Sequence, residues 1–207
     1  GIQLFPVIFT NKRDRILSFY SLNEIKKILS SIDKASFHGK RDYAILLLFI
    51  ETGIRSSDLK NLKISDIQWD KKLITFTQYK TNIPNSLTIS DNLKFALIDY
   101  LKNERPKSSS EYLFIKPKSL GQYDATTVHH IVSSYFIKGD LDISKRHHGP
   151  HALRHSLANN LLSSNAPMHV IQSVLGHKTL NTTQIYLNID IESLKKFALE
   201  VPGHAKQ

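Results

Sequence analysis

The chain has 207 residues, enough to bury the core of one full domain, and it contains no cysteine. The lack of cysteine excludes a disulfide framework and a thiolate metal site, and it fits a reducing compartment such as the cytosol. Lysine and arginine number 28 against 18 acidic residues, and this net charge of +10 favours a polyanionic partner such as nucleic acid, although a solvated basic surface has the same composition.

The N-terminal part of the chain predicts an extension followed by two helices. Residues 1–20 show no clear period and are predicted to form an N-terminal arm or interdomain linker, without a recognisable signal peptide. Ser21 and Glu24 form a capping-box pair, in which each side chain can satisfy a free amide of a first helical turn. The segment 41–53 is apolar nearly all round, which predicts a buried helix that ends at Gly53.

A shorter amphipathic stretch follows over residues 54–67. Its apolar residues recur on one face, which predicts a further helix with Arg55 and Asp58 together on the opposite face. The longest apolar run of the chain, residues 43–50, is far shorter than the ~20 residues that span a bilayer. We therefore expect no membrane partner.

Between residues 67 and 90 the apolar pattern changes to a period of two. Three short segments, 67–70, 73–80 and 86–90, are separated by polar turns, which predicts a small three-stranded antiparallel sheet. Lys80 ends the second of these strands, where a lone lysine is usually a solvated edge residue.

The rest of the chain again shows helical patterns. Asp91 is predicted to be the N-cap of a helix that reaches Pro106, and residues 111–115 form a short strand or extended piece. An amphipathic helix over 124–137 precedes a basic, histidine-bearing loop. Further helices are predicted at 150–163, 167–175, 180–187 and 190–199, so the fold class is mainly α with a small antiparallel β-sheet at one edge.

Two groups of residues in these elements can bind an anion. Arg55 follows Gly53 at a loop-to-helix junction, where a guanidinium and backbone amides can hold a phosphate together, although the alternative is a surface arginine that pairs with Asp58. His151 and Arg154 are three residues apart and share one face of a helix, but an isolated pair at this spacing is common by chance.

Two further residues lie nearer the C-terminus. His177 follows a Leu-Gly pair and can simply cap a helix, and Tyr186 can simply be a half-buried aromatic residue. Histidine, arginine and tyrosine together can bind an anion, move a proton and form a covalent bond. That combination suits phosphoryl transfer without a metal.

Three segments together resemble the catalytic domain of the tyrosine recombinases, the phage-type integrase family. They are TGIRSSDL (52–59), HALRHSLANNLL (151–162) and LGHKTLNTTQIY (175–186), in the order that the family shows. The resemblance implies the fold of a DNA breaking-rejoining enzyme over residues 21–207, including a C-terminal tail. Members of the family usually carry a core-binding domain before this one, and only residues 1–20 precede it here, so we expect a fragment of a longer protein.

The resemblance also implies the residues that act. Glutamate is commoner than aspartate at the acidic position, and the lysine is assigned only by its place in the hairpin, with Lys71 and Lys72 nearby. The implied catalytic residues are Arg55, Lys80, His151, Arg154, His177 and the nucleophile Tyr186, with Asp58 as the accessory acidic companion of the first arginine.

These roles agree with the chemistry of a phosphodiester. Two arginines and a histidine donor can stabilise charge on its non-bridging oxygens, and a lysine can protonate the leaving 5′-oxygen. A tyrosine hydroxyl, with a pKa of about 10, becomes a good nucleophile only when neighbouring groups favour its phenolate. A covalent 3′-phosphotyrosyl link conserves the bond energy, so we expect no ATP, no cofactor and no metal.

The function implied is a site-specific recombinase that cuts and rejoins double-stranded DNA at a specific site, for integration or excision of a mobile element. Chromosome-dimer resolution is one alternative, and a catalytically silent DNA-binding accessory module of the same fold is another. A type IB topoisomerase fits less well, because the Leu-Gly-His motif lies so close before the tyrosine. The resemblance further implies a monomer in solution, a homo-tetramer on DNA, and a cytoplasmic, nucleoid-associated location.

Overall fold

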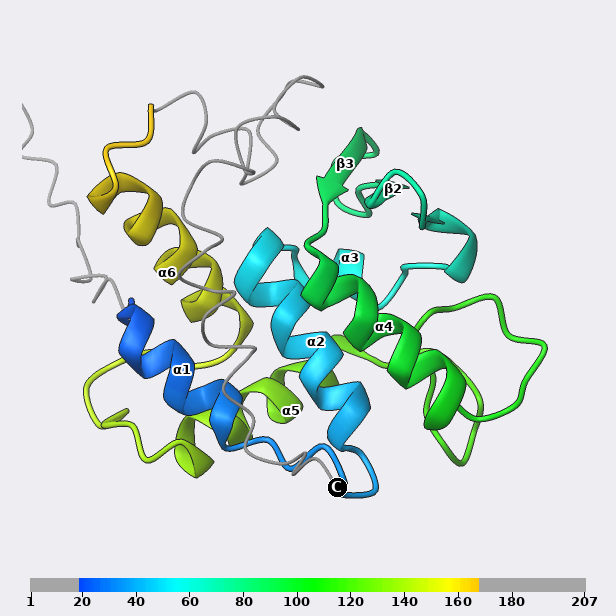
Figure 1. The fold of residues 1–207 in the computed structure, drawn as a ribbon, viewed down its shortest axis with the longest axis horizontal. Coiled ribbons are helices and arrows are strands. Elements are labelled where there is room, and N and C mark those ends of the chain that lie inside the picture. The colour runs from blue at the N-terminus through cyan, green and yellow to red at the C-terminus, as the bar shows by residue number, and fades with distance from the viewer. Residues whose placement is uncertain (1–18, 168–207) are drawn as a thin grey trace, which may run out of the picture.

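The computed structural model describes residues 19–167, which form a layer of helices with a small sheet at one end (Figure 1). The predicted fold class, mainly α with a small antiparallel sheet, is confirmed. The predicted helices at 180–187 and 190–199, and all but the first residue of the one at 167–175, lie outside the described residues. The elements are α1 (Leu22–Ser30), α2 (Gly39–Thr52), α3 (Ser56–Leu59), the 3₁₀ turn η1 (Ile64–Asp66), β1 (Ile67–Gln68), β2 (Leu73–Thr77), β3 (Pro84–Thr88), α4 (Asp91–Asn103), α5 (Ala125–Lys138) and α6 (Pro150–Ser163).

Helix α2 is at the centre of the packing. Every residue from 44 to 50 is buried, as the all-round apolar sequence predicts, because α1 and α6 cover one side of the helix and α4 the other (Figure 1). The helix ends where Gly53 adopts a left-handed conformation, with φ 59° and ψ 24°. No described helix is both long and apolar enough to cross a membrane.

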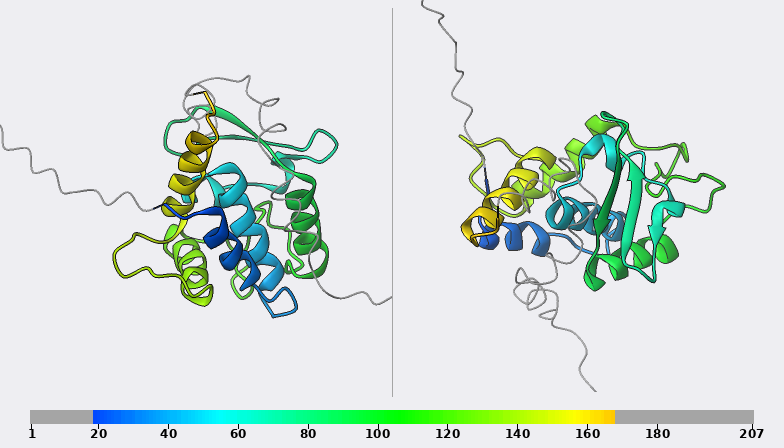
Figure 2. Two further views of the ribbon diagram at one scale, coloured as in Figure 1. Left: turned by 60° about the vertical axis from the view of Figure 1, so that its left-hand side comes forward. Right: turned by 90° about the horizontal axis from the view of Figure 1, so that it is seen from above.

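The sheet has the strand order β1-β2-β3, with both pairs antiparallel, and it lies beyond the C-terminal end of α2 (Figure 2). Ile74 pairs with Ile67 on one side and with Leu87 on the other, and all three residues are buried. Strand β2 is shorter than predicted and ends at Thr77, since residues 78–83 form a loop closed on itself by backbone hydrogen bonds.

The predicted helix over 54–67 is wrong for most of its length. Only the four residues of α3 are helical, and η1 adds a single 3₁₀ turn. The backbone between them turns away because it pairs with the extended segment 111–115: the Leu113 amide donates to the Leu62 carbonyl at 2.7 Å and the Ile64 amide to the Glu111 carbonyl at 2.9 Å. The predicted extended piece therefore exists and ends the helix.

The N-cap of α4 is also different from the prediction. Ser90, one residue before Asp91, accepts the Leu93 amide on its hydroxyl oxygen at 3.1 Å. The same hydroxyl donates to the Glu51 carboxyl group at 2.9 Å, so α2 selects which residue caps α4. Helix α4 ends at Asn103, before Pro106 is reached.

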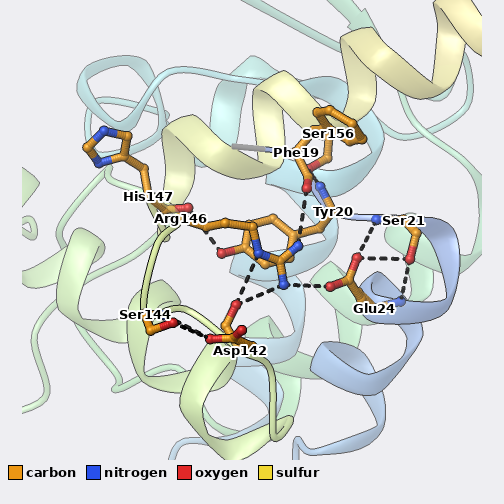
Figure 3. Close-up of polar contacts among 9 residues, drawn as sticks. All are labelled: Phe19, Tyr20, Ser21, Glu24, Asp142, Ser144, Arg146, His147 and Ser156. Carbon is orange, nitrogen blue, oxygen red and sulfur yellow. Dashed lines mark hydrogen bonds and ion pairs between the residues drawn. The ribbon is translucent and has the colours of Figure 1, made fainter. Parts of the chain in front are cut away.

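Arg146 fastens the loop that precedes α6 to the start of α1 (Figure 3). Its guanidinium donates to Glu24 Oε1 at 2.7 Å and to the Asp142 carbonyl at 2.9 and 3.0 Å. It also lies over the ring of Tyr20, 4.1 Å from the ring centroid. Arg146 therefore joins the start of α1 to the loop between α5 and α6.

Tyr20, whose ring lies under Arg146, forms an anchor with it between the start of α1 and α6 (Figure 3). Its buried ring donates a hydroxyl hydrogen bond to the His147 carbonyl at 3.1 Å, and its backbone amide donates to Ser156 Oγ in α6 at 2.8 Å. Because His147 precedes α6 and Ser156 lies within it, the anchor fixes the N-terminal end of that helix.

Replacing Arg146 by alanine should lower the free energy of unfolding by about 2 kcal/mol, since hydrogen bonds to a charged group and a cation–π contact are lost together. Chemical denaturation followed by circular dichroism measures the change. The control is Lys145→Ala, which removes the same charge from an exposed neighbour in the same loop. An equal loss in both variants would mean that loop charge, and not the anchor, sets the stability.

The same variant should make stability respond differently to pH. Burial raises the pKa of Glu24, but the hydrogen bonds from Arg146 and Ser21 outweigh burial and lower that pKa overall. A carboxyl group with a lowered pKa contributes stability above its unfolded pKa of about 4.3 and loses it as the pH falls through the folded pKa. The difference between wild type and Arg146→Ala should therefore shrink below a pH of about 4.

Candidate active site

Arg55 is positioned by the tight turn at the end of α2. Gly53 turns the chain, the Thr52 hydroxyl caps the turn by accepting the Ile54 amide at 3.3 Å, and Arg55 becomes the N-cap residue of α3. Its side chain is half-buried and points across to the loop between β2 and β3, where Nη1 donates to Gln78 Oε1 at 3.2 Å. No ion pair joins it to Asp58 within the described part of the chain, so the alternative of a simple Arg55–Asp58 pair is not supported.

His151 and Arg154 come from the first turns of α6. The helix begins with Gly149 at φ 104° and ψ −166°, followed by Pro150 at the first helical position. Gly149 is required there, because a Cβ atom would lie 2.7 Å from His129 Cε1 and the positive φ disfavours other residues. The backbone of α6 can thus approach α5 closely just before His151.

The C-terminal end of α2, which leads to Arg55, meets the first turns of α6, which carry His151 and Arg154. Arg154 Nη1 donates a short hydrogen bond to the carbonyl of Gly53, two residues before Arg55. The pKa of His151 lies below its ordinary value, first because of partial burial and then because positive charge on His155, Arg154, Arg55 and His129 opposes its protonation. The structure therefore brings the two predicted arginines and His151 together.

Such a group suits an anionic ligand. Two guanidinium groups supply fixed positive charge with forked donors that match phosphate oxygens. A histidine with a lowered pKa is neutral at pH 7 and keeps one N–H donor and one acceptor. The described residues contain no group of three or more His, Cys, Asp or Glu side chains arranged to hold a metal ion.

The sequence predicted Asp58 on the face opposite the apolar residues. The structure buries it instead, with only 3% of the residue exposed. Its carboxylate oxygen Oδ1 accepts the backbone amide of Tyr79 at 2.8 Å. The aspartate is buried because its carboxylate accepts a backbone amide of the β2–β3 loop. This hydrogen bond brings the loop against the start of α3.

Lys80 follows directly in that loop and is exposed. It comes from the loop after β2, not from the strand end that the sequence predicted. Lys71 and Lys72 lie in the β1–β2 turn at the opposite end of β2, and Lys72 pairs with Asp91 at 2.7 Å. Of these three lysines, only Lys80 belongs to the loop that contacts Arg55, through Gln78.

The sequence prediction missed Gln78, which is 4% exposed and in contact with Arg55. A signal was present, since the period of two that makes Ile74 and Phe76 face inward also makes Gln78 face inward. A polar side chain at such a position needs partners. Two predicted residues, His177 and Tyr186, lie outside the described residues.

Comparison with known proteins decides the family. A sequence model described as the Phage integrase family matches residues 19–192. The chain belongs to the phage integrase family. The recognition of a tyrosine recombinase catalytic domain from three short segments is thereby confirmed.

Relatives and solved structures in this family agree. The chain is 31% identical over 184 residues to y4rF of Sinorhizobium fredii, named for the integrase/recombinase class, covering 88% of this chain and 43% of that one. It is 35% identical over 176 residues to tyrosine recombinase XerA of Pyrococcus horikoshii, covering 84% and 58%. The crystal structure of XerH site-specific recombinase bound to difH substrate matches with a TM-score of 0.66 and 24% identity, over 86% of this chain and 52% of that one, which shows a shared fold.

This chain thus spans about half the length of these curated integrase-family relatives.

Proposed function

We propose that this protein is a site-specific DNA recombinase that cuts and rejoins DNA through a 3′-phosphotyrosyl intermediate at Tyr186. The observation that carries the proposal is the convergence of Arg55, His151 and Arg154 at the junction of α2 and α6, with the Lys80 loop beside them. Family membership supports the same reaction.

Each residue has a part in one displacement. The oxygen of Tyr186, deprotonated to its phenolate, attacks the phosphorus of a phosphodiester, and the bond to the 5′-oxygen breaks. The Lys80 ammonium donates a proton to the leaving 5′-oxygen. Arg55 and Arg154 stabilise the charge on the non-bridging oxygens, and His151 and His177 donate hydrogen bonds to them. Asp58 is the accessory residue that holds the loop carrying the lysine.

The partner we propose is double-stranded DNA at a specific site. The protein would be a monomer in solution and a homo-tetramer on DNA, acting in the cytoplasm at the nucleoid. The class name of y4rF and the difH complex of XerH support recombination as the activity, and we favour integration or excision of a mobile element as its role.

Covalent trapping tests the activity. The protein is incubated at high concentration with a pool of nicked duplexes of randomised sequence. Cleavage near the nick releases a short strand that diffuses away, so the covalent protein–DNA intermediate cannot be rejoined and accumulates. A denaturing gel should show a protein–DNA adduct, and the trapped strands should share one sequence. Saturated DNA binding without any adduct would contradict the enzymatic role and favour the silent accessory module.

The same trapped strands address the biological role. A recovered site that matches the ends of a mobile element supports integration or excision. A recovered site at a single chromosomal locus would instead support chromosome-dimer resolution.

DNA binding should depend steeply on salt. A net charge of +10 supplies phosphate contacts, and each neutralised phosphate of a duplex contributes about −0.9 to the slope of log K against log salt. We expect a slope steeper than about −4, measured by fluorescence anisotropy with a labelled duplex. A flat titration would contradict duplex DNA as the partner.

A further inference from the structure

Gln78 is a buried amide that joins the two parts of the candidate active site. Its Oε1 atom accepts a hydrogen bond from Arg55 Nη1 at 3.2 Å and another from Thr81 Oγ1 at 2.7 Å. Arg55 belongs to the turn after α2, and Thr81 belongs to the same loop as Lys80. A single oxygen atom therefore receives one donor from each side.

The backbone of Gln78 closes this loop at its base. Its amide donates to the Ile83 carbonyl at 2.9 Å, and its carbonyl accepts the Asn82 amide at 2.9 Å. Asn82 has φ 53°, a left-handed conformation that asparagine adopts more readily than most residues. The loop of residues 78–83 is thus a folded unit with its own hydrogen bonds.

Lys80 lies between two fixed neighbours in this unit. The amide of Tyr79 donates to Asp58, and the hydroxyl of Thr81 donates to Gln78. The backbone of Lys80 is therefore held on both sides, while its side chain stays exposed. A change at Gln78 would move Lys80 and the Arg55 guanidinium together.

An amide is the right chemical group for this position. A glutamine oxygen accepts a hydrogen bond from Arg55 without cancelling the charge of the guanidinium. A carboxylate at the same place would form an ion pair with Arg55 and weaken its attraction for a phosphate. The two side chains are nearly equal in size, so the difference between them is charge.

We propose that Gln78 is a positioning residue. It holds the Arg55 guanidinium and the loop that carries the Lys80 ammonium in the relative positions that one phosphodiester requires. This inference rests on the proposed recombinase function. Gln78 does not touch the DNA in this scheme and acts through Arg55 and the loop.

Two variants and one control test the proposal. Gln78→Ala removes the shared acceptor, and Gln78→Glu keeps its shape and adds a negative charge. The control, Gln68→Ala, removes a half-buried glutamine of the same sheet, whose Nε2 donates to Thr75 Oγ1 at 3.2 Å. Melting temperature and DNA affinity are measured first for all three. The substrate is the duplex recovered by trapping with the wild-type protein.

Cleavage by Gln78→Ala should be slower than wild type by about 10- to 100-fold, because a misplacement of about 1 Å can cost about 100-fold in rate. Gln78→Glu should be slower still, although its melting temperature stays near that of wild type. Gln68→Ala should cleave at the wild-type rate. Wild-type cleavage in Gln78→Ala, or equal rates in the Ala and Glu variants, would overturn the proposal.

The lysine part of the role has its own readout. A substrate with sulfur in place of the leaving 5′-oxygen needs little help from a general acid, since a thiolate is a good leaving group. The defect of Gln78→Ala should become several-fold smaller on this substrate if Lys80 is misplaced. A defect of the same size on both substrates would limit the role to Arg55 and overturn the claim that Gln78 positions the lysine.

Hydrogen exchange separates this proposal from the proposed function. Gln78→Ala should speed exchange of the amides of Tyr79 and Asn82 and leave the β1–β2 turn unchanged, whether or not the protein cleaves DNA. Unchanged exchange in residues 78–83 would overturn the positioning role. A wild-type protein that forms no adduct, with exchange altered as expected in the variant, would count against the recombinase function while the structural unit stands.

Discussion

Replacing Tyr186 by phenylalanine is expected to abolish the covalent protein–DNA adduct while leaving the affinity for duplex DNA nearly unchanged. Phenylalanine keeps the aromatic ring and lacks only the hydroxyl oxygen that we propose attacks phosphorus. The arginines that we propose to bind the phosphate, Arg55 and Arg154, are unchanged in this variant, so binding should persist. Trapping on the nicked duplex and anisotropy on the intact duplex measure the two properties separately.

Tyr79→Phe is the matched control for this experiment. Tyr79 is 68% exposed in the loop next to Lys80, so it is a second tyrosine beside the candidate site that undergoes the same chemical change. It should form the adduct at the wild-type rate. An adduct that survives in Tyr186→Phe and disappears in Tyr79→Phe would assign the nucleophile to the loop.

Local sequence signals were enough to predict the main helices and the sheet that position the candidate site. The apolar run of α2, the left-handed Gly53 and the capping box at Ser21 are each set by neighbours within a few residues. The period of two over 67–90 likewise predicted the sheet, in which each strand buries one residue, Ile67, Ile74 or Leu87, against the same core.

The errors have a common physical cause in contacts between distant segments. Asp58 is buried by the amide of Tyr79, which lies 21 residues further along the chain. Ser90 caps α4 with the support of Glu51, which lies 39 residues earlier. Helical spacing cannot indicate such partners, since it reports only which residues share a face.

In the candidate site too, local motifs predicted some residues, and a contact between distant segments accounts for the one that was missed. Arg55, His151 and Arg154 were found because short motifs of the family carry them, and the structure brings them together. Gln78 was missed because its importance comes from a bond to Arg55 across 23 residues, not from a motif.

Replacing Arg154 by lysine is expected to slow cleavage by at least about 100-fold, the cost of losing one donor that stabilises charge in the transition state. Lysine keeps the positive charge and loses the planar fork that binds two phosphate oxygens at once. One branch of that fork, Nη1, donates to the Gly53 carbonyl, which fixes how the guanidinium lies relative to Arg55. A lysine ammonium cannot hold this carbonyl and grip a phosphate with the same geometry.

Arg105→Lys is the matched control, because Arg105 is a partly buried arginine that also donates to backbone carbonyls, those of Ser110, Tyr112 and Leu113, at 2.8 to 3.2 Å. Single-turnover cleavage of the trapped duplex and the melting temperature are measured for both variants. Arg105→Lys should lose some thermal stability and cleave at nearly the wild-type rate once folded. Arg154→Lys should instead bind DNA, remain folded and cleave slowly, since its charge persists and its fork does not. If Arg154→Lys cleaves as fast as the control, charge alone suffices at this position and Arg154 does not hold the scissile phosphate through paired hydrogen bonds.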